Sequence, residues 1–166
     1  MILVDRREQD TERSRKRYAR FCTPYERCTL DFGDYTYNCQ LPSGKWLYDV
    51  SETLKPDVVI ERKMSLDELA QCYTWERRRF QTEFEKAAAN HSRSYLLVEN
   101  ATWENLLNGK YRSRLTAQAY AASAVAWMAR YGVGVIFCKE ETSGRLIREI
   151  LYRELKERLE RGDYDG

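Results

Sequence analysis

Histidine is almost missing from the sequence, and its scarcity excludes zinc sites that need two or three imidazole ligands. The one histidine, His91, is expected on the surface near a helix end. The cysteines are odd in number and form no CxxC pair, which favours reduced thiols in an intracellular protein; they are Cys22, Cys28, Cys39, Cys72 and Cys138. No glycine-rich phosphate loop is present, so we expect no nucleotide cofactor and consider a small-molecule α/β enzyme a weak alternative.

Long hydrophobic runs are also missing. The longest, Tyr95–Val98 and Val133–Cys138, fall far short of the ~20 apolar residues that a helix needs to cross a bilayer. The first residues, Met1–Arg6, lack the charged-then-apolar layout of a signal peptide. We therefore expect an intracellular protein with no membrane partner.

Charge is plentiful but nearly balanced. Charged residues make up 33% of the chain, yet the formal net charge is only +2, so attraction to a polyanion has to come from local clusters. Arg13–Arg20 and Lys110–Arg114 are two such clusters, each either a solvated face or a phosphate-contacting surface. Hydrophobic residues reach 43%, enough for a core, and 166 residues fit one domain.

The order of apolar segments predicts an α/β fold with a mixed central sheet and helices on both faces. In the first half we expect a basic helix and an antiparallel meander, with the helix over Arg13–Arg20 and strands at Met1–Asp5, Cys28–Phe32, Tyr35–Cys39 and Trp46–Val50. In the second half strands and helices alternate, which implies parallel strands joined by helical crossovers. We expect strands at Val58–Ile60, Tyr95–Glu99 and Val133–Lys139, and helices after the capping box at Ser65–Glu68 and over Trp75–Asn90, Ala117–Tyr131 and Thr142–Arg161.

The segment Val58–Lys63 points to chemistry, because an apolar strand ends there in acid, base and base. Side chains alternate along a strand, so Glu61 and Lys63 should share one side while Arg62 points to the other. A carboxylate and an ammonium on one side of a strand end can hold a metal ion and orient a water, as phosphodiester hydrolysis requires. A solvated strand end is the alternative for this pair taken alone.

A second carboxylate is needed, because Mg²⁺ is usually held by one or two carboxylates together with waters and substrate phosphate. Asp57 precedes the same strand, but it lies four residues from Glu61, about 13 Å at ~3.3 Å per residue, which is too far to share an ion. Asp34 is the better partner, since it begins a strand directly after Gly33, which permits a sharp bend.

These motifs together resemble the XPF/Hef-type structure-specific endonucleases. Gly33-Asp34, then Glu61-Arg62-Lys63 and Asp67, match the GD…ERKxxxD signature of that family. Val4–Glu8 resembles the family's opening VDxRE, Arg77–Gln81 resembles its RxxxQ helix, and Leu96–Glu99 resembles the strand that follows. The resemblance covers roughly Ile2 to Leu155, nearly the whole chain.

The resemblance implies a restriction-endonuclease-like fold of the PD-(D/E)xK type that cuts branched or flapped DNA with Mg²⁺ or Mn²⁺. The catalytic residues it assigns are Asp34, Glu61, Arg62, Lys63 and Asp67. The metal would be held by Asp34, Glu61 and Asp67, and Lys63 would position the attacking water. Asp67 is alternatively a residue that only favours the helix N-terminus by its charge. The residues that would support the site or contact DNA are Asp5, Arg7, Glu8, Arg77 and Gln81.

Residues 1–166 are expected to form one nuclease domain, with no helicase or helix-hairpin-helix domain. The chain then resembles the stand-alone versions of phages and mobile elements, in the cytoplasm of a bacterium or an infected host. A metal-dependent endonuclease of repair, recombination or phage DNA processing is the main hypothesis. The alternatives are a non-catalytic DNA-binding module of the same fold and a sequence-specific restriction-type nuclease.

A homodimer is a further expectation. The nuclease domains of the family pair through the helices that follow the core strands, which are Ala117–Tyr131 and Thr142–Arg161 in this sequence. Tyr120, Trp127 and Tyr131 give the first of these helices more aromatic surface than a crossover needs, and aromatic residues are favoured anchors at interfaces. The alternative is a monomer in which these rings pack on its own sheet.

Overall fold

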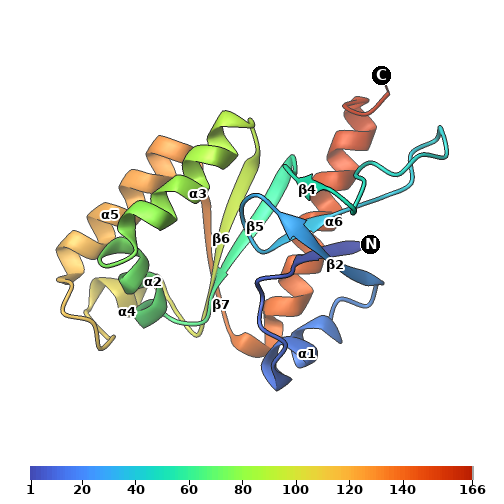
Figure 1. Cartoon of the computed structure of the whole chain (residues 1–166). Helices are drawn as coiled ribbons and strands as arrows, with labels where there is room; N and C mark the ends of the chain where they lie inside the picture. The colour runs from blue at the N-terminus through green and yellow to red at the C-terminus, as the bar shows by residue number, and fades with distance from the viewer. Residues whose placement is uncertain (166) are drawn as a thin grey trace.

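A seven-stranded mixed sheet runs through the centre of the computed structural model, which describes residues 1–165 (Figure 1). The strand order is β4-β2-β1-β3-β5-β6-β7. The strands are β1 (Ile2–Asp5), β2 (Tyr25–Leu30), β3 (Tyr35–Tyr37), β4 (Thr53–Leu54), β5 (Val58–Lys63), β6 (Arg93–Glu99) and β7 (Gly134–Cys138). The helices are α1 (Glu12–Tyr18), α2 (Leu66–Tyr73), α3 (Arg77–Ala89), α4 (Trp103–Leu107), α5 (Ala117–Tyr131) and α6 (Glu140–Arg161). The predicted fold class, a mixed central sheet flanked by helices, is confirmed.

The first half of the sheet is not the predicted antiparallel meander. The N-terminal strand β1 lies between β2 and β3, and it pairs in parallel with β2 and antiparallel with β3. Helix α1 connects β1 to β2 and returns the chain to its starting edge, so both strands run in the same direction. The basic helix was therefore predicted correctly, but its effect on strand direction was missed.

The predicted strand at Trp46–Val50 is also wrong. This segment makes one isolated bridge, between Gln40 and Trp46. The Asn38 side chain takes the place of a partner strand, because its amide donates to the Tyr48 carbonyl at 3.0 Å and its Oδ1 accepts from the Tyr48 amide at 3.0 Å. The sheet instead gains the short strand β4, which pairs in parallel with β2.

The second half follows the prediction of parallel strands with helical crossovers. β5 pairs in parallel with β6, and β6 pairs in parallel with β7. Helix α2 begins after the N-cap Ser65, whose hydroxyl accepts from the Glu68 amide at 3.2 Å. Within residues 1–165, no helix combines the length and the apolar character that a bilayer crossing requires.

The helices cover the two faces of the sheet as separate layers (Figure 1). Helices α1 and α6 lie on one face, over a core that includes Tyr18, Phe21 and Ile147. Helices α2, α3 and α5 lie on the other face, where α3 brings its Phe80 into the core. Strand β5 contacts both layers, because its side chains alternate: Ile60 faces the first core, and Val59 packs in a small cluster with Phe32 and Ala87 of α3.

The aromatic side chains of α5 belong to the second core. Tyr120 and Trp127 are 0% and 2% exposed, and Trp127 stacks on Phe80 with ring centroids 5.0 Å apart. Tyr73 meets Trp127 edge-on at 4.9 Å. These rings therefore pack on the chain's own sheet, so the aromatic argument for a dimer interface on α5 was wrong.

Gly33 allows β3 to approach β5 closely. Its φ of +74° lies in the left-handed region, and a Cβ at this position would lie 1.9 Å from Cγ2 of Val59. Because only glycine meets both conditions, the chain turns tightly enough for the Asp34 amide to donate to the Ile60 carbonyl at 2.9 Å. The glycine thereby places Asp34 against the charged end of β5.

We predict that Gly33→Ala lowers the free energy of unfolding by about 2–5 kcal/mol, since it adds a left-handed non-glycine residue to an overpacked contact. Gly44→Ala is the matched control, because Gly44 has a φ of +82° but nothing within 4 Å of its Cβ position. The control should lose only about 1–2 kcal/mol. Urea unfolding of both variants gives the difference, and equal losses would show that Val59 yields without cost.

Candidate active site

The carboxyl ends of β1, β5 and β6 meet at one edge of the sheet, because β1 and β5 are both antiparallel to β3 and β6 is parallel to β5. A cleft of about 600 Å³ lies at this edge, between α1 on one side and α2 and α3 on the other. Asp34, Glu61 and Lys63 all line it. The carboxyl ends of strands are where α/β sheets usually place their ligands.

Glu61 and Lys63 share one side of β5, as predicted. The Lys63 ammonium lies 2.6 Å from Glu61 Oε1, and each side chain is 13% exposed. Burial lowers the pKa of Lys63, but the charges of Glu61 and Asp34 outweigh this effect and raise that pKa above its ordinary value. Lys63 is therefore a cation at neutral pH, suited to hold a water or a phosphate oxygen rather than to accept a proton.

Asp34 faces the same cleft from β3 and is held by the backbone of β5. Its Oδ2 accepts a hydrogen bond from the Arg62 amide at 2.7 Å. Burial, followed by the nearby charge of Glu61, raises the pKa of Asp34 well above its ordinary value. Two carboxylates in one desolvated site repel each other, and Lys63 compensates only one of these charges.

The chemistry of these donors fits a hard divalent ion. Carboxylate oxygens are the ligands that Mg²⁺ and Mn²⁺ prefer, and a cation would relieve the repulsion between Asp34 and Glu61. Two carboxylates suffice when waters and substrate phosphate complete the shell. Within residues 1–165, however, no group of three or more histidine, cysteine, aspartate or glutamate side chains is placed to hold an ion.

Asp67, the third predicted ligand, points elsewhere. Its Oδ1 accepts hydrogen bonds from the backbone amides of Arg112 and Ser113 at 2.6 and 3.1 Å, and the residue does not line the cleft. The predicted set of three carboxylates is therefore not assembled. In this structure Asp67 ties the basic Lys110–Arg114 loop to the first turn of α2, a position that also suits its charge.

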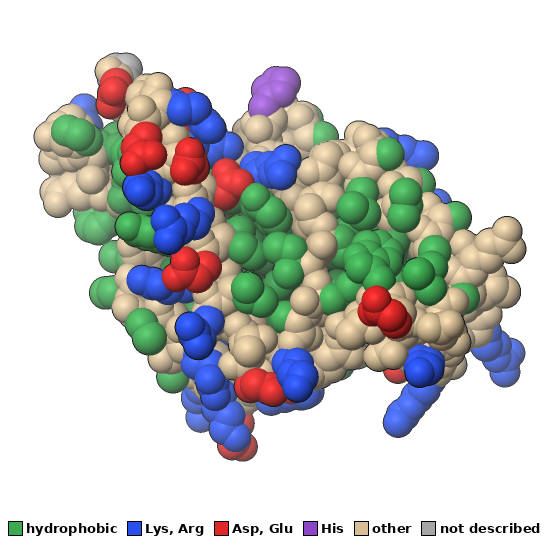
Figure 2. All heavy atoms as spheres, turned by 180° about the vertical axis from the view of Figure 1, so that it is seen from behind, with side chains coloured by type: hydrophobic (Ala, Val, Ile, Leu, Met, Phe, Trp, Pro, Cys, Tyr) green, Lys and Arg blue, Asp and Glu red, His purple; other side chains and the backbone are tan. Residues whose placement is uncertain are grey.

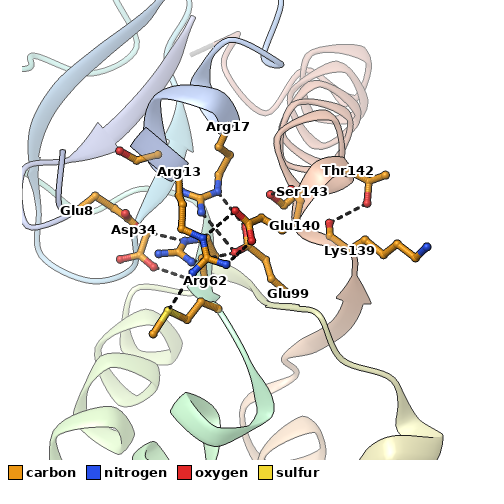
Figure 3. A network of polar contacts seen from close by, with 12 residues as sticks. Glu8, Arg13, Arg17, Asp34, Arg62, Glu99, Lys139, Glu140, Thr142 and Ser143 are labelled. Atoms are coloured by element: carbon orange, nitrogen blue, oxygen red, sulfur yellow. Dashed lines mark hydrogen bonds and ion pairs between the residues drawn. The ribbon is translucent and has the colours of Figure 1, made fainter. Parts of the chain in front are cut away.

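Arg62 lies on the opposite side of β5 from Glu61 and Lys63, within a chain of ion pairs (Figure 3). Its Nε lies 3.1 Å from Glu8 Oε1, and its Nη1 lies 3.2 Å from Glu99 Oε2. Burial lowers the pKa of Arg62, but Glu8 above all raises it beyond its ordinary value. Arg62 thus holds the carboxylates of Glu8 and Glu99 in fixed positions.

Two further members of this network were not predicted. Glu99 at the end of β6 pairs with Arg17 of α1, with Nε and Oε1 3.0 Å apart, and the two side chains are only 1% and 3% exposed. Arg13, one turn earlier on α1, lines the cleft and pairs with Glu140 at the start of α6. Helix α1 is therefore not only a solvated surface. The run of basic residues in its sequence did not indicate that one of them has a buried acidic partner.

The opening motif is built around Asp5, which is 1% exposed. Its Oδ1 accepts from the Arg7 amide and from Arg7 Nε, both at 2.7 Å, and its Oδ2 accepts from the Leu30 amide at 2.8 Å. These hydrogen bonds tie β1 to β2 and direct the Arg7 guanidinium to the cleft. There, Arg7 Nη1 lies 3.5 Å from Glu83 Oε1. Asp5 thus supports the site, while Arg7 and Glu8 line it.

The RxxxQ pair does not reach the cleft. Arg77 bonds the Tyr73 carbonyl and Gln81 bonds Glu85, whereas the α3 residues that line the cleft are Glu76, Arg79, Phe80 and Glu83. At about 100° per residue, this second set lies on one side of Phe80 around the helix, and Arg77 and Gln81 lie on the other. Arg77 and Gln81 do lie on one face of α3, as their i, i+4 spacing predicts. The burial of Phe80 in the core, however, turns a different face of α3 toward the cleft.

Asp57 lies at the opposite end of β5, which supports its exclusion from the site. Its carboxylate accepts from the Tyr164 hydroxyl at 2.9 Å, and its amide donates to the Tyr48 hydroxyl at 2.9 Å. Tyr164 in turn lies 2.8 Å from the Tyr37 hydroxyl. These contacts tie the C-terminal segment to the sheet.

Comparison with known families finds the ERCC4 domain over residues 4–150. Among solved structures, the chain is similar to XPF from Aeropyrum pernix, with a TM-score of 0.62 and 17% identity over 92% of this chain and 60% of that one. It is also similar to the same protein in complex with DNA, with a TM-score of 0.64 and 19% identity over 95% of this chain and 66% of that one. The chain thus spans less than two thirds of the length of these structures. No significant match is found among curated protein sequences.

We predict that Asp34→Asn stabilises the metal-free protein at neutral pH. A raised pKa means that the folded state binds the proton of Asp34 more tightly than the unfolded state does. The protonated Asp34 carboxyl therefore stabilises the folded state at a pH below its unfolded pKa of about 4. This stabilisation is lost as the pH rises through the pKa of Asp34 in the folded state. In EDTA at neutral pH the variant should melt higher, by about 2–4 °C for each kcal/mol of repulsion removed.

The difference in melting temperature should shrink toward about pH 4, where the wild-type carboxyl is protonated. Mg²⁺ should also reduce it, by stabilising the wild type more than the variant. Thermal denaturation with and without Mg²⁺ across this pH range measures both effects. A variant that melts below the wild type at every pH would show that the hydrogen bond from Arg62 outweighs the repulsion.

Proposed function

Because the chain belongs to the ERCC4 domain family, we propose that it is a metal-dependent endonuclease that hydrolyses phosphodiester bonds at branched or flapped DNA. The observation that carries this proposal is the presence of Asp34, Glu61 and Lys63 in one cleft at the carboxyl ends of the strands. The match to a solved structure of XPF with DNA supports DNA as the substrate. We place the activity inside the cell, in repair, recombination or phage DNA processing.

Each residue of the cleft has a defined part in this proposal. Asp34 and Glu61 would hold Mg²⁺ or Mn²⁺. When bound, such an ion neutralises phosphate charge and lowers the pKa of water. Lys63 is already fixed beside Glu61 and would orient the attacking water or the scissile phosphate. Because its ammonium is prealigned in a buried site, little rearrangement is needed during the reaction.

The remaining charges of the cleft would bind and align the DNA backbone. Arg7 and Arg79 both line the cleft, and both are exposed enough to meet phosphate. Glu8, Arg62 and Glu99 are paired with one another and would keep the end of β5 rigid. Residues 1–166 would act as one nuclease domain.

The test is cleavage of duplex, flap, fork and Holliday-junction DNA in Mg²⁺, with EDTA as the negative control. We predict that Asp34→Asn and Glu61→Gln each lower the single-turnover rate at least about a hundredfold while DNA affinity is kept, because each removes a negative charge that would hold the metal ion, and the ion stabilises the transition state. Binding without cleavage by the wild-type protein would favour the non-catalytic module. Cutting of one duplex sequence would favour the restriction-type alternative.

Lys63→Ala should lower the single-turnover rate by about 10²–10³-fold and DNA affinity by much less, since a water-positioning group acts mainly in the transition state. Lys63→Arg should rescue only part of the rate, because a planar guanidinium replaces a compact ammonium. Lys86→Ala is the matched control, since Lys86 pairs with Asp31 outside the cleft. An alanine variant that binds weakly but cuts normally at saturation would make Lys63 a phosphate anchor.

The proposed homodimer still involves the predicted helix α5, but it uses the exposed side of this helix and the edge of β7 instead of the buried aromatic residues. Strand β7 ends the sheet with an unpaired edge, and all five of its residues are half-buried. Val125 of α5, the helix that precedes β7 in the chain, is 54% exposed. Figure 2 shows hydrophobic side chains gathered on this face of the molecule. An exposed edge strand with apolar surroundings favours pairing, and a second copy of the chain would cover it.

Val125→Glu should convert a dimer to a monomer without loss of the fold, whereas Trp127→Glu should unfold the domain because Trp127 is buried. Light scattering gives the mass of the wild type and of Val125→Glu, and circular dichroism reports folding. The expected wild-type mass is twice the 19.7 kDa of one chain. A wild-type mass of one chain, with and without DNA, would contradict the dimer.

A further inference from the structure

Trp75 is the most exposed large hydrophobic side chain among residues 1–165. It is 91% exposed, whereas the next, Leu107, is 58% exposed. An indole contributes about 150–250 Å² of surface when it is covered, so leaving it in water forgoes a large stabilisation. The sequence pattern predicted Trp75 inside a helix, but α3 begins only at Arg77 and Trp75 lies in the turn after α2. The folded chain makes no use of this ring.

The turn that carries Trp75 is firmly held on both sides of the ring. The Thr74 hydroxyl donates to the Ala70 carbonyl at 2.9 Å, and the Glu76 amide donates to the Gln71 carbonyl at 3.1 Å. Immediately before the turn, Tyr73 is 3% exposed and packs edge-on against Trp127. Trp75 is therefore presented to solvent by an ordered backbone anchored in the core, which lowers the conformational entropy lost on binding.

The surroundings of Trp75 select the kind of ligand. The next residue, Glu76, lines the candidate active site, so Trp75 lies directly beside a residue of the cleft in the chain. Arg77, Arg78 and Arg79 follow directly and are all exposed. An exposed ring beside a row of guanidinium groups is the combination that binds single-stranded nucleic acid, because the ring stacks on a base while the cations contact phosphates.

We propose that Trp75 is a stacking platform for an unpaired base of the DNA substrate, held next to the cleft by phosphate contacts from Arg79, which lines the cleft, and from the exposed Arg78. This inference rests on the proposed function and names the feature of the substrate that the cleft would recognise. Fully paired DNA keeps its bases inside the helix, so only a flap, fork or gap offers a base to the ring. Stacking is tolerant of sequence, since every base has a π-face. Trp75 would therefore distinguish DNA with unpaired bases from fully paired DNA, whatever the base sequence.

The experiment measures binding in the Asp34→Asn background, so that DNA is not cut. Fluorescence anisotropy would compare a flap substrate with a fully paired duplex of equal length. Trp75→Ala should weaken flap binding by about 5- to 100-fold, the range of one base stacked on an aromatic side chain, and should leave duplex binding unchanged. Trp75→Phe should restore most of the affinity. Trp46→Ala is the matched control, because Trp46 is also exposed, at 50%, but lies in the Gln40–Trp46 loop outside the cleft.

A second readout tests stacking directly. The fluorescence of 2-aminopurine placed at the first unpaired position should be quenched by the Asp34→Asn protein and by its Trp46→Ala derivative, but not by its Trp75→Ala derivative. Equal loss of flap and duplex affinity, or quenching that survives in Trp75→Ala, would overturn the inference. A change in mass by light scattering on Trp75→Ala would instead make the ring a contact between copies of the chain.

The two proposals can fail separately. If the Asp34→Asn protein binds no DNA at all, both the proposed function and the role of Trp75 are rejected. If it binds flap DNA and the wild type cuts it, but Trp75→Ala behaves as the control does, only the role of Trp75 is rejected. Because Trp75 makes little contact with the fold, circular dichroism should show no change in any Trp75 variant.

Discussion

The structure depends on how charge is balanced at the carboxyl end of β5. Glu61, Arg62 and Lys63 follow one another there, and each side chain is largely removed from water. Charges in such a place are costly unless each has a partner. The strand solves this by alternation, because Lys63 compensates Glu61 on one side while Arg62 meets Glu8 and Glu99 on the other.

The charges behind β5 are fully paired, whereas the carboxylates in front of it are crowded together. Behind β5, Arg62, Arg17, Glu8 and Glu99 form two acids and two bases, so this network carries no net charge (Figure 3). In front of β5, Lys63 pairs with Glu61, and burial together with the charge of Glu61 raises the pKa of Asp34. The paired network behind the strand has the character of a scaffold, and the crowded carboxylates Asp34 and Glu61 have the character of a binding site.

Much of this arrangement was predictable from the sequence for physical reasons. The apolar run before Glu61 identified a buried strand, and the period of two then placed Glu61 and Lys63 together. Gly33 before Asp34 indicated a close approach of backbones. The structure explains why glycine is needed, because a Cβ at this position would lie only 1.9 Å from Cγ2 of Val59. The alternation of strands and helices gave the parallel half of the sheet.

The remaining features depend on contacts between distant segments, which a single sequence does not display. Asn38 satisfies the backbone of Tyr48 and so replaces a strand that β-propensity favours. Asp67 finds the amides of Arg112 and Ser113, 45 and 46 residues away, instead of an ion. The phase of α3 is set by the packing of Phe80, which turned the expected Arg77 and Gln81 away from the cleft.

The place of β1 in the sheet has a consequence for how the chain folds. Strand β1 lies between β2 and β3, and the Asp5 carboxylate at its end accepts a hydrogen bond from the Leu30 amide. The ion pair of Arg17 with Glu99 closes a loop of 82 residues, and loops of this length form slowly because of their entropy. A nascent chain that has not yet reached Glu99 therefore lacks this ion pair, so the wall of the cleft cannot be complete before β6 has been synthesised.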